Sequence, residues 1–324
     1  MNIKIDRFIL ATITTILIAY LYPNWGSKQS AVPLDLIGSI GISLIFFFYG
    51  LKLSPDKIKS GLKNWKLHIL VQLTTFLIFP LIVIAFKPLI QTEEAQTLWL
   101  SFLFLAALPS TVSSSVVMVS IAKGNIPASI FNASISGLIG IIVTPLWISL
   151  FLQHNTTDYH IESIYMSLIV QILLPVILGM LLQKYWGKLA LHYKTQLTVF
   201  DKSIILLIIY KSFAQSFEEQ IFSSVSIPDL LLLFAMVIVL FYTVYFITGF
   251  LSGLLKFNTE DRITAQFCGT KKSLVHGTVF SEILFPSTMS MGIILLPLMI
   301  FHALQIFIVS IIAARLAKRK IDDE

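Results

Sequence analysis

The sequence predicts an all-helical membrane protein with ten transmembrane helices in two inverted five-helix repeats, and three observations lead to this prediction. Of the 324 residues, 56% are hydrophobic and only 12% are charged, against about 25% charged in a soluble domain. Apolar segments near the roughly 20 residues that cross a bilayer recur along the whole chain. Two of them, the fourth and the ninth, are interrupted by polar residues. A repeat with an odd number of spans necessarily places its second copy upside down.

The apolar segments divide evenly between two halves of one transmembrane domain, repeat one over 1–152 and repeat two over 153–324. The first segment follows a short charged stretch like a signal peptide. We keep it as a span, because the bulky residues 21–25 offer no small-residue cleavage site. The expected spans are 5–22, 33–53, 65–87, 96–121, 126–152, 161–184, 202–217, 229–255, 260–284 and 290–317.

The basic residues lie mostly on one side of these spans. Of the 23 Lys and Arg residues, Lys28, Lys87 and Lys211 fall on one side, Lys271 and Lys272 fall inside the ninth span, and the others fall on the opposite side. Loops rich in Lys and Arg remain in the cytoplasm, so both termini are predicted to be cytoplasmic. The net charge of +6 therefore reflects topology in a lipid bilayer and does not indicate a nucleic-acid partner.

The fourth span contains Pro109 followed by a cluster of hydroxyl residues that includes Ser113, Ser114 and Ser115. Proline removes an amide donor from a helix, and irregular backbone at membrane depth is tolerated only inside protein or along a cavity. Small hydroxyl residues are also common where helices pack, so the serines either pack or form a site. Their position directly after the proline favours a site.

The ninth span carries the most costly polar residues of the chain, in the stretch Gly269, Thr270, Lys271, Lys272 and Ser273. A lysine at the centre of a span costs roughly 2.5 to 3.5 kcal/mol, so such residues usually serve a pathway or a site. The lysines could instead extend to the surface if the span were misplaced, but the apolar run 274–284 argues against this. Adjacent helical residues point about 100° apart, so we expect one lysine to line a substrate cavity and the other to occupy an internal polar site.

Other polar residues inside spans are weaker candidates. Asn132 and Ser134 in the fifth span either satisfy the broken helix or pack, and Thr75 in the third is a minor candidate. His276 has no companion at metal-ligand spacing, so we expect a packed histidine and no metal site. A single cysteine excludes a disulfide framework. Acidic residues lie almost wholly in loops, Glu282 being the exception, and no catalytic motif of a membrane enzyme is present.

Several motifs together resemble the bile acid:sodium symporter superfamily, in the bacterial branch that is similar to human solute carrier family 10, member 7. They are FFFYGLKLS at 46–54, NWKLH at 64–68, ALPSTVSSS at 107–115, AKGN at 122–125, FCGTKKS at 267–273 and LPLMIFH at 296–302. The resemblance implies a core domain (65–152 and 229–317) with broken, crossing helices 4 and 9, and a panel domain (5–53 and 161–217). It also implies substrate binding between the two domains, alternating access and a bacterial-type inner membrane.

The resemblance also places the family's sodium ligands on this chain. A Ser-Asn pair falls on Ser114 and Ser115, and a Gln falls on Thr75. Helix 5 hydroxyls fall on Ser129 and Ala133, or on Asn132 and Ser134 if the register moves by one. A Glu-Val-Gly-Met-Gln-Asn pattern aligns with 267–272, so phenylalanine stands at the acidic position and Lys271 and Lys272 stand at the amide positions.

An ammonium close to a sodium site repels the ion. The resemblance therefore implies degenerate sodium sites, with a lysine ammonium in one former sodium position that donates to Ser114, Ser115 and nearby carbonyls. That lysine either holds the core in its ion-loaded form or titrates and couples transport to protons. The sequence leaves both open.

Together these observations predict a secondary transporter for a small organic anion, with no cofactor and no enzyme activity. Two rivals belong to other classes. One is a non-transporting membrane protein that regulates ion flux or scaffolds envelope assembly. The other is a lipid-headgroup enzyme with Lys271, Lys272 and His276 as its polar site.

Overall fold

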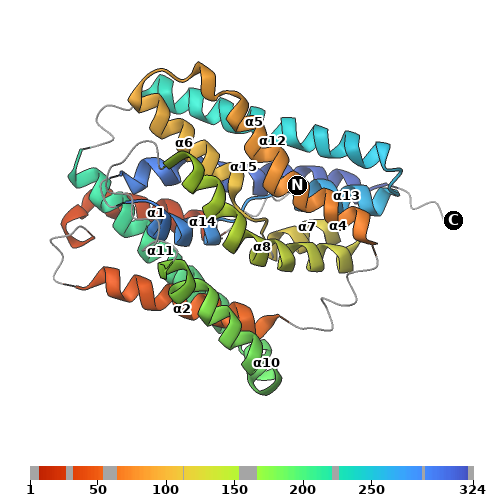
Figure 1. Ribbon diagram of the computed structural model, residues 1–324, viewed down its shortest axis with the longest axis horizontal. Helices are drawn as coiled ribbons and strands as arrows, with labels where there is room; N and C mark the ends of the chain where they lie inside the picture. Colours follow the sequence, from red (N-terminus) through yellow and green to blue (C-terminus); the bar gives the residue numbers. More distant parts are fainter. Residues whose placement is uncertain are drawn as a thin grey trace. The chain divides into compact units, whose positions relative to one another are not determined.

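The computed structural model describes residues 7–26, 32–53, 64–111, 113–152, 166–220, 226–286 and 289–319, and in these ranges the chain is helical with short connections and no strand (Figure 1). The α-helices are α1 (Arg7–Leu21), α2 (Leu34–Lys52), α4 (Trp65–Leu73), α5 (Phe79–Ala85), α6 (Glu93–Ala107), α7 (Ser113–Ile121), α8 (Ile126–Leu152), α10 (Leu174–His192), α11 (Lys194–Glu218), α12 (Ile227–Leu254), α13 (Thr259–Thr270), α14 (Leu274–Leu284) and α15 (Met291–Leu316). Two π-helical segments, η3 (Thr74–Ile78) and η5 (Ile169–Leu173), and two 3₁₀ turns, η1 (Pro23–Trp25) and η4 (Lys87–Leu89), complete the described elements.

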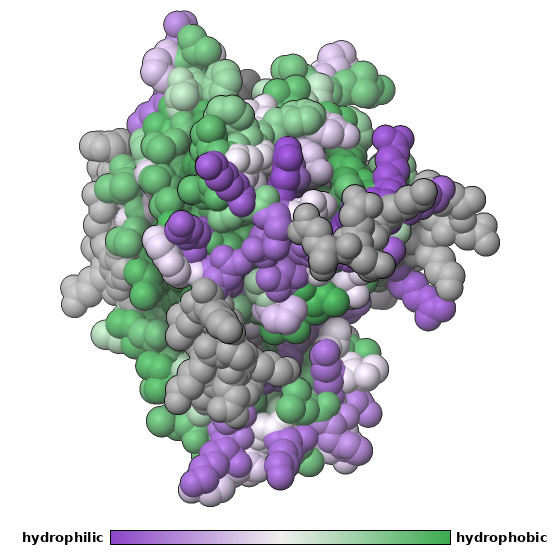
Figure 2. Space-filling view, turned by 90° about the vertical axis from the view of Figure 1, so that its right-hand side faces the viewer, coloured by the Kyte–Doolittle hydropathy of each residue, from purple (hydrophilic) through white to green (hydrophobic). Residues whose placement is uncertain are grey.

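The apolar surface of the chain identifies a multi-pass membrane protein. Six helices within the described ranges are long and apolar enough to cross a bilayer, and two shorter apolar helices accompany them. Large apolar side chains such as Leu181, Val239 and Phe250 are exposed. Hydrophobic side chains also cover wide parts of the face in Figure 2, with hydrophilic ones toward its middle and lower end. A soluble monomer rarely exposes so much contiguous apolar surface, whereas lipid covers it in a membrane.

Two predicted spans differ from the helices observed. The seventh span, predicted over 202–217, is the second part of α11, which begins at Lys194. The sixth, predicted over 161–184, belongs to a helix that runs over Met166–His192. In both cases the helix continues through charged residues outside the apolar stretch. Hydropathy locates the membrane-embedded part of a helix and says nothing of its polar extension.

The predicted interruptions at Pro109 and at the two lysines are both present. α6 ends at Ala107 and α7 begins at Ser113, while α13 ends at Thr270 and α14 begins at Leu274. Leu108 and Lys271 have extended backbone angles directly after their helices. At each interruption one helix therefore ends in an extended residue, and the next helix begins a few residues later.

The chain divides into two compact units. Unit 1 comprises Met1–Ser54, Leu152–Leu230 and Gly277–Leu296; unit 2 comprises Pro55–Phe151, Leu231–His276 and Pro297–Glu324. Both interruptions lie in unit 2, whereas α14 belongs to unit 1 from Gly277 onward.

In unit 1, α2 and α10 pack closely side by side (Figure 1). Glycines allow this approach: a β-carbon at Gly50 would collide with the carbonyl oxygen of Val176, and one at Gly179 with the carbonyl oxygen of Phe47. Helices in membranes associate through small residues that bring the two backbones together. The α2–α10 contact is therefore a backbone-to-backbone contact that no larger residue could maintain.

In unit 2, the backbone hydrogen bonds of the helix formed by α4, η3 and α5 are interrupted at Pro80. Proline has no N–H, so the carbonyl of Phe76, four residues earlier, loses its helical donor. The indole Nε1 of Trp147 donates to that carbonyl at 2.8 Å. A side chain from α8 thus satisfies the backbone group that the proline leaves unpaired, as required inside a membrane.

Candidate functional site

The two interruptions contact each other within unit 2. The backbone N–H of Ser273 donates to the carbonyl oxygen of Pro109 at 2.9 Å. The hydroxyl of Ser110 donates to the carbonyl oxygen of Cys268 at 2.7 Å. The segment between α6 and α7 packs closely on α8, because a β-carbon at Gly140 of α8 would lie 2.8 Å from Pro109 Cγ. Two unwound segments that are far apart in the sequence therefore form one polar junction.

The ammonium of Lys272 lies inside this junction in a cage of backbone carbonyls. Its Nζ donates to the carbonyl oxygens of Thr75 at 2.7 Å, Ala106 at 2.5 Å and Leu108 at 2.9 Å. It also lies 4.2 Å from the centre of the Phe79 ring, and the side chain is fully buried. A lysine ammonium has three N–H donors and no acceptor. The three carbonyls thus match its full donor capacity, and the aromatic face adds a cation–π contact.

Two of these carbonyls are available because α6 ends at the junction. The last carbonyls of a helix have no donor within the helix and carry its partial negative charge. Here Lys272 takes the carbonyls of Ala106 and Leu108, while the hydroxyl of Thr144 donates to the carbonyl of Ala107 between them at 2.7 Å. The end of α6 is therefore a cation site occupied by a side chain of the protein itself.

The third carbonyl is available because of the π-helical segment η3. The N–H of Phe79 donates to the carbonyl of Thr74 instead of to that of Thr75. The next residue in a π-helical pattern is Pro80, which has no N–H. The carbonyl of Thr75 is left without a helical donor, and Lys272 supplies one. The sequence had indicated Thr75 as a minor candidate; its hydroxyl donates to the carbonyl of Val71, and its backbone oxygen makes the contact with Lys272.

The backbone of Lys272 is held by Gln305 of α15. The Lys272 N–H donates to Gln305 Oε1 at 2.8 Å, and Gln305 Nε2 donates to the Lys272 carbonyl at 2.8 Å. One amide side chain thus satisfies both backbone groups of a residue that has left the helix. Sequence reasoning missed Gln305. An isolated amide in an apolar span was the signal that could have indicated it.

Lys271 lies in different surroundings from Lys272, although both lie beyond the end of α13, so the turn of about 100° per residue in a regular helix is not the reason. Its side chain is also fully buried, and its Nζ donates to the backbone carbonyl of Ser114 at 2.7 Å. Among the described residues, the carbonyl of Ser114 is the one hydrogen-bond acceptor of the Lys271 ammonium. Both lysine side chains are 0% exposed, so it stays a prediction that one of them lines a substrate cavity.

Four of the remaining predicted residues differ in what their side chains contact. Ser115 and Ser129 face the junction: the Ser115 hydroxyl lies 3.0 Å from that of Thr111, and Ser129 Oγ lies 3.3 Å from Cys268 Sγ. By contrast, Ser134 and Thr270 donate to carbonyls of their own helices.

Three further candidates take packing or supporting roles, and one is not described. Asn132 accepts from Gln72 Nε2 at 3.2 Å, and Ser273 Oγ pairs with His276 Nδ1 at 2.9 Å. Gly269 brings α13 close to η3, because a β-carbon there would lie 3.1 Å from Thr74 Cγ2. The Ser113 side chain lies outside the described part of the chain.

The described residues contain no group of three or more His, Cys, Asp or Glu side chains that could hold a metal ion. Apolar helices with unwound, polar segments buried between them are typical of membrane transport proteins. The chain belongs to the SBF-like CPA transporter family, whose model matches residues 6–318.

The alignments with three relatives extend over nearly the whole chain. It is 38% identical to an uncharacterized protein of Pseudomonas aeruginosa, PA2026, over 98% of this chain and 94% of the relative. It is 34% identical to the putative symporter YfeH of Escherichia coli, over 96% of this chain and 92% of the relative. It is 30% identical to sodium/bile acid cotransporter 7-B of Xenopus laevis, over 96% and 91% respectively. The family and these relatives indicate a symporter-type transporter and not an enzyme.

Proposed function

We propose that this chain is a secondary transporter that moves a small organic anion across the inner membrane by alternating access, with the ammonium of Lys272 in place of a coupling sodium ion. The observation that carries the proposal is the cage of three carbonyl oxygens around Lys272 Nζ. Carbonyls at the ends of unwound helices bind the coupling cations of secondary transporters. Here the cation in such a place is covalently attached to the chain.

The charge of Lys272 bears directly on sodium coupling. A second cation in the same cage would meet the ammonium at contact distance with no carboxylate among the contacts of Lys272 to offset the repulsion. The cage is also saturated, because three donors meet three acceptors. Sodium binding there would require the Lys272 side chain to leave, so transport through this junction proceeds without sodium at that position.

Lys271 supports an anionic substrate. Its ammonium has three donors, and the described residues offer it one carbonyl. The carboxylate or phosphate of a solute would complete its hydrogen bonds when the junction becomes accessible during transport. A buried charge with incomplete pairing is costly, so this arrangement favours an anion over a neutral solute.

The arrangement of moving parts is also part of the proposal. We assign the core to 65–152 and 229–317, with the panel at 5–53 and 161–217, as two inverted repeats over 1–152 and 153–324 and with both termini in the cytoplasm. The division into compact units supports the assignment of core and panel for most of the chain. It differs at Gly277–Leu296, which belongs to unit 1 although the assignment places it in the core.

Reconstituted protein tests the proposal. Proteoliposomes would be incubated with a mixture of small organic acids, amines and neutral polyols, then washed and analysed by mass spectrometry against protein-free liposomes. We expect one or more organic acids to accumulate in the protein-containing liposomes, to the same extent in sodium and in choline buffers. Accumulation of amines or polyols alone, or uptake that requires sodium, would refute the proposal.

A further inference from the structure

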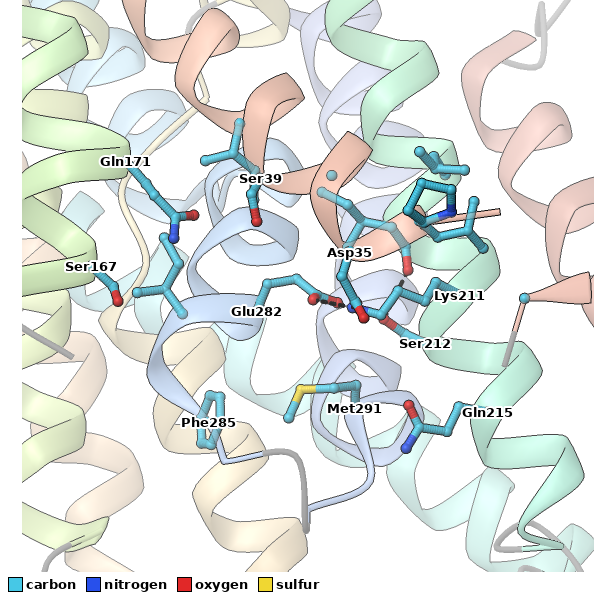
Figure 3. A pocket seen from close by; sticks show the side chains of 18 of the residues that line it. Asp35, Ser39, Ser167, Gln171, Lys211, Ser212, Gln215, Glu282, Phe285 and Met291 are labelled. Carbon is cyan, nitrogen blue, oxygen red and sulfur yellow. Dashed lines mark hydrogen bonds and ion pairs between the residues drawn. The ribbon is translucent and has the colours of Figure 1, made fainter. Parts of the chain in front are cut away.

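A second polar cluster lies in unit 1, where a cavity of about 570 Å³ is bounded by α2, α11, α14, the start of α15 and the helix that begins at Met166. This is within the range of small-molecule sites, roughly 300 to 1,000 Å³. Figure 3 shows Asp35, Lys211 and Glu282 meeting on one side of it, and Ser167 and Gln171 lying across from them. None of these residues belongs to the junction around Lys272.

The charges at this cavity do not cancel. Lys211 Nζ lies 2.6 Å from Asp35 Oδ1 and 2.6 Å from Glu282 Oε2, so one ammonium is shared by two carboxylates. These are the charged side chains among the described residues that line the cavity. The lining therefore has a formal excess of one negative charge, and most donors of Lys211 are already taken.

Glu282 does not stabilise its own helix. It lies in the last turn of α14, where a carboxylate is disfavoured by the partial negative charge of the helix end. Its side chain is only 17% exposed, and the hydroxyl of Ser212 also donates to it, at 3.3 Å. Asp35, in contrast, is in the first turn of α2, where a carboxylate is favoured, and its side chain is 80% exposed. One carboxylate is thus held inside the cavity, while the other retains acceptor capacity toward an incoming group.

From this geometry we infer that the cavity of unit 1 binds a small amphipathic solute through an ammonium group, which Asp35 and Glu282 accept in competition with Lys211. The excess negative charge attracts a cation and repels a simple anion. Ser39, Gln171 and Gln215 offer hydrogen bonds to hydroxyl or amide groups, and Ile42, Phe285 and Met291 provide apolar contact. The inference does not rest on the proposed transport function. A solute with an amino group in addition to an acid group is compatible with both.

Three six-carbon probes of matched length separate the charge classes: 6-amino-1-hexanol, 1,6-hexanediol and 6-hydroxyhexanoate. Binding would be measured by isothermal titration calorimetry on the full-length protein in a neutral detergent. We expect 6-amino-1-hexanol to bind at least about tenfold more tightly than the other two, which is the factor that corresponds to about 1.4 kcal/mol. Equal binding of the three probes, or preference for 6-hydroxyhexanoate, would overturn the inference.

Variants locate the binding. Asp35→Asn and Glu282→Gln each remove one negative charge and keep an amide oxygen in its place, and each should weaken binding of 6-amino-1-hexanol about tenfold. Gly38→Leu keeps all three charges and fills the cavity: Gly38 lines it, and a β-carbon there would meet nothing within 4 Å. It should abolish binding without disturbing the fold. Asp201→Asn is the matched control, because Asp201 pairs with Lys52 in the same unit and does not line the cavity. Binding that persists in Gly38→Leu, or that falls as far in Asp201→Asn, would overturn the inference whether or not transport is observed.

Discussion

The ammonium of Lys272 donates to the carbonyl oxygen of Leu108 at 2.9 Å. A side chain from the interruption between α13 and α14 thus caps the C-terminal end of α6 at the other interruption. The two residues are 164 positions apart. Each solves a problem that the other creates, since a buried ammonium needs acceptors and a helix end inside a membrane needs donors. The stability of the junction should therefore depend on this one side chain.

Replacing Lys272 with methionine should destabilise the protein by roughly 3 kcal/mol, because three buried carbonyls lose their donor while apolar bulk is retained. The thermal unfolding midpoint in detergent would measure this. Lys188→Met is the control, since Lys188 is exposed on α10. Equal midpoints for the two variants would contradict the cage.

Sodium should not stabilise the wild-type protein. A ligand that binds only the folded state adds RT ln(1 + [L]/Kd), about 2.7 kcal/mol at a hundredfold excess over Kd. We expect the same unfolding midpoint in sodium chloride and choline chloride at equal ionic strength. A sodium-specific increase would show that the lysines leave a sodium site intact.

Lys272→Ala should create a sodium response that the wild type lacks. This variant empties the cage and leaves the carbonyls of Thr75, Ala106 and Leu108 available to a small cation. Its unfolding midpoint should rise in sodium chloride relative to choline chloride. If sodium and choline gave the same midpoint for this variant, the cage would not be a cation site in the sense proposed.

Gln305→Leu should destabilise the protein by about 2 to 4 kcal/mol, because the N–H and the carbonyl of Lys272 both lose their partners while buried. Hydrogen exchange of the Lys272 amide would report the loss more directly than the unfolding midpoint. Gln196→Leu, on an exposed position of α11, serves as the control. Unchanged protection of the Lys272 amide would argue against the two hydrogen bonds between Gln305 and the Lys272 backbone.

Gly50→Ala and Gly38→Ala should change stability in opposite directions, although both lie on α2. At Gly50 the new methyl group would collide with the backbone of α10, and such overpacking costs about 1 to 3 kcal/mol. At Gly38 the space is open, so alanine should stabilise the helix by about 0.5 to 1 kcal/mol. Circular-dichroism melting curves of the two variants would decide, and shifts of the same sign would contradict the close α2–α10 contact.

The interruptions were predictable because a run of hydroxyl residues follows Pro109 directly, and because Lys271 and Lys272 are costly inside an apolar helix. The composition likewise predicted a membrane protein. These inferences depend only on the residue itself and its cost in lipid.

The partners inside the junction were not predictable in the same way. Thr75 was a minor candidate, but that its backbone carbonyl would make the contact was not predicted, because η3 and Pro80 shift the hydrogen-bond register there. Gln305 acquires its role only through the packing of α15 on the interruption. The start of α11 at Lys194 also escaped prediction, because charged residues that extend a helix into water resemble a loop. For Thr75 and Gln305 the partner was decided by packing against the interruption, which the local sequence does not specify.

The ammonium in the carbonyl cage is part of the protein, so its presence there does not depend on the concentration of any ion in the surrounding medium. A tethered group has an effective concentration set by the chain that carries it, and dilution does not change that value. Removing salt from the medium therefore cannot empty this position, and a salt gradient cannot drive its occupancy. In fresh water and in brine the cage holds the same charge, so the work of moving a solute has to come from the solute's own gradient, the membrane potential or an ion bound elsewhere.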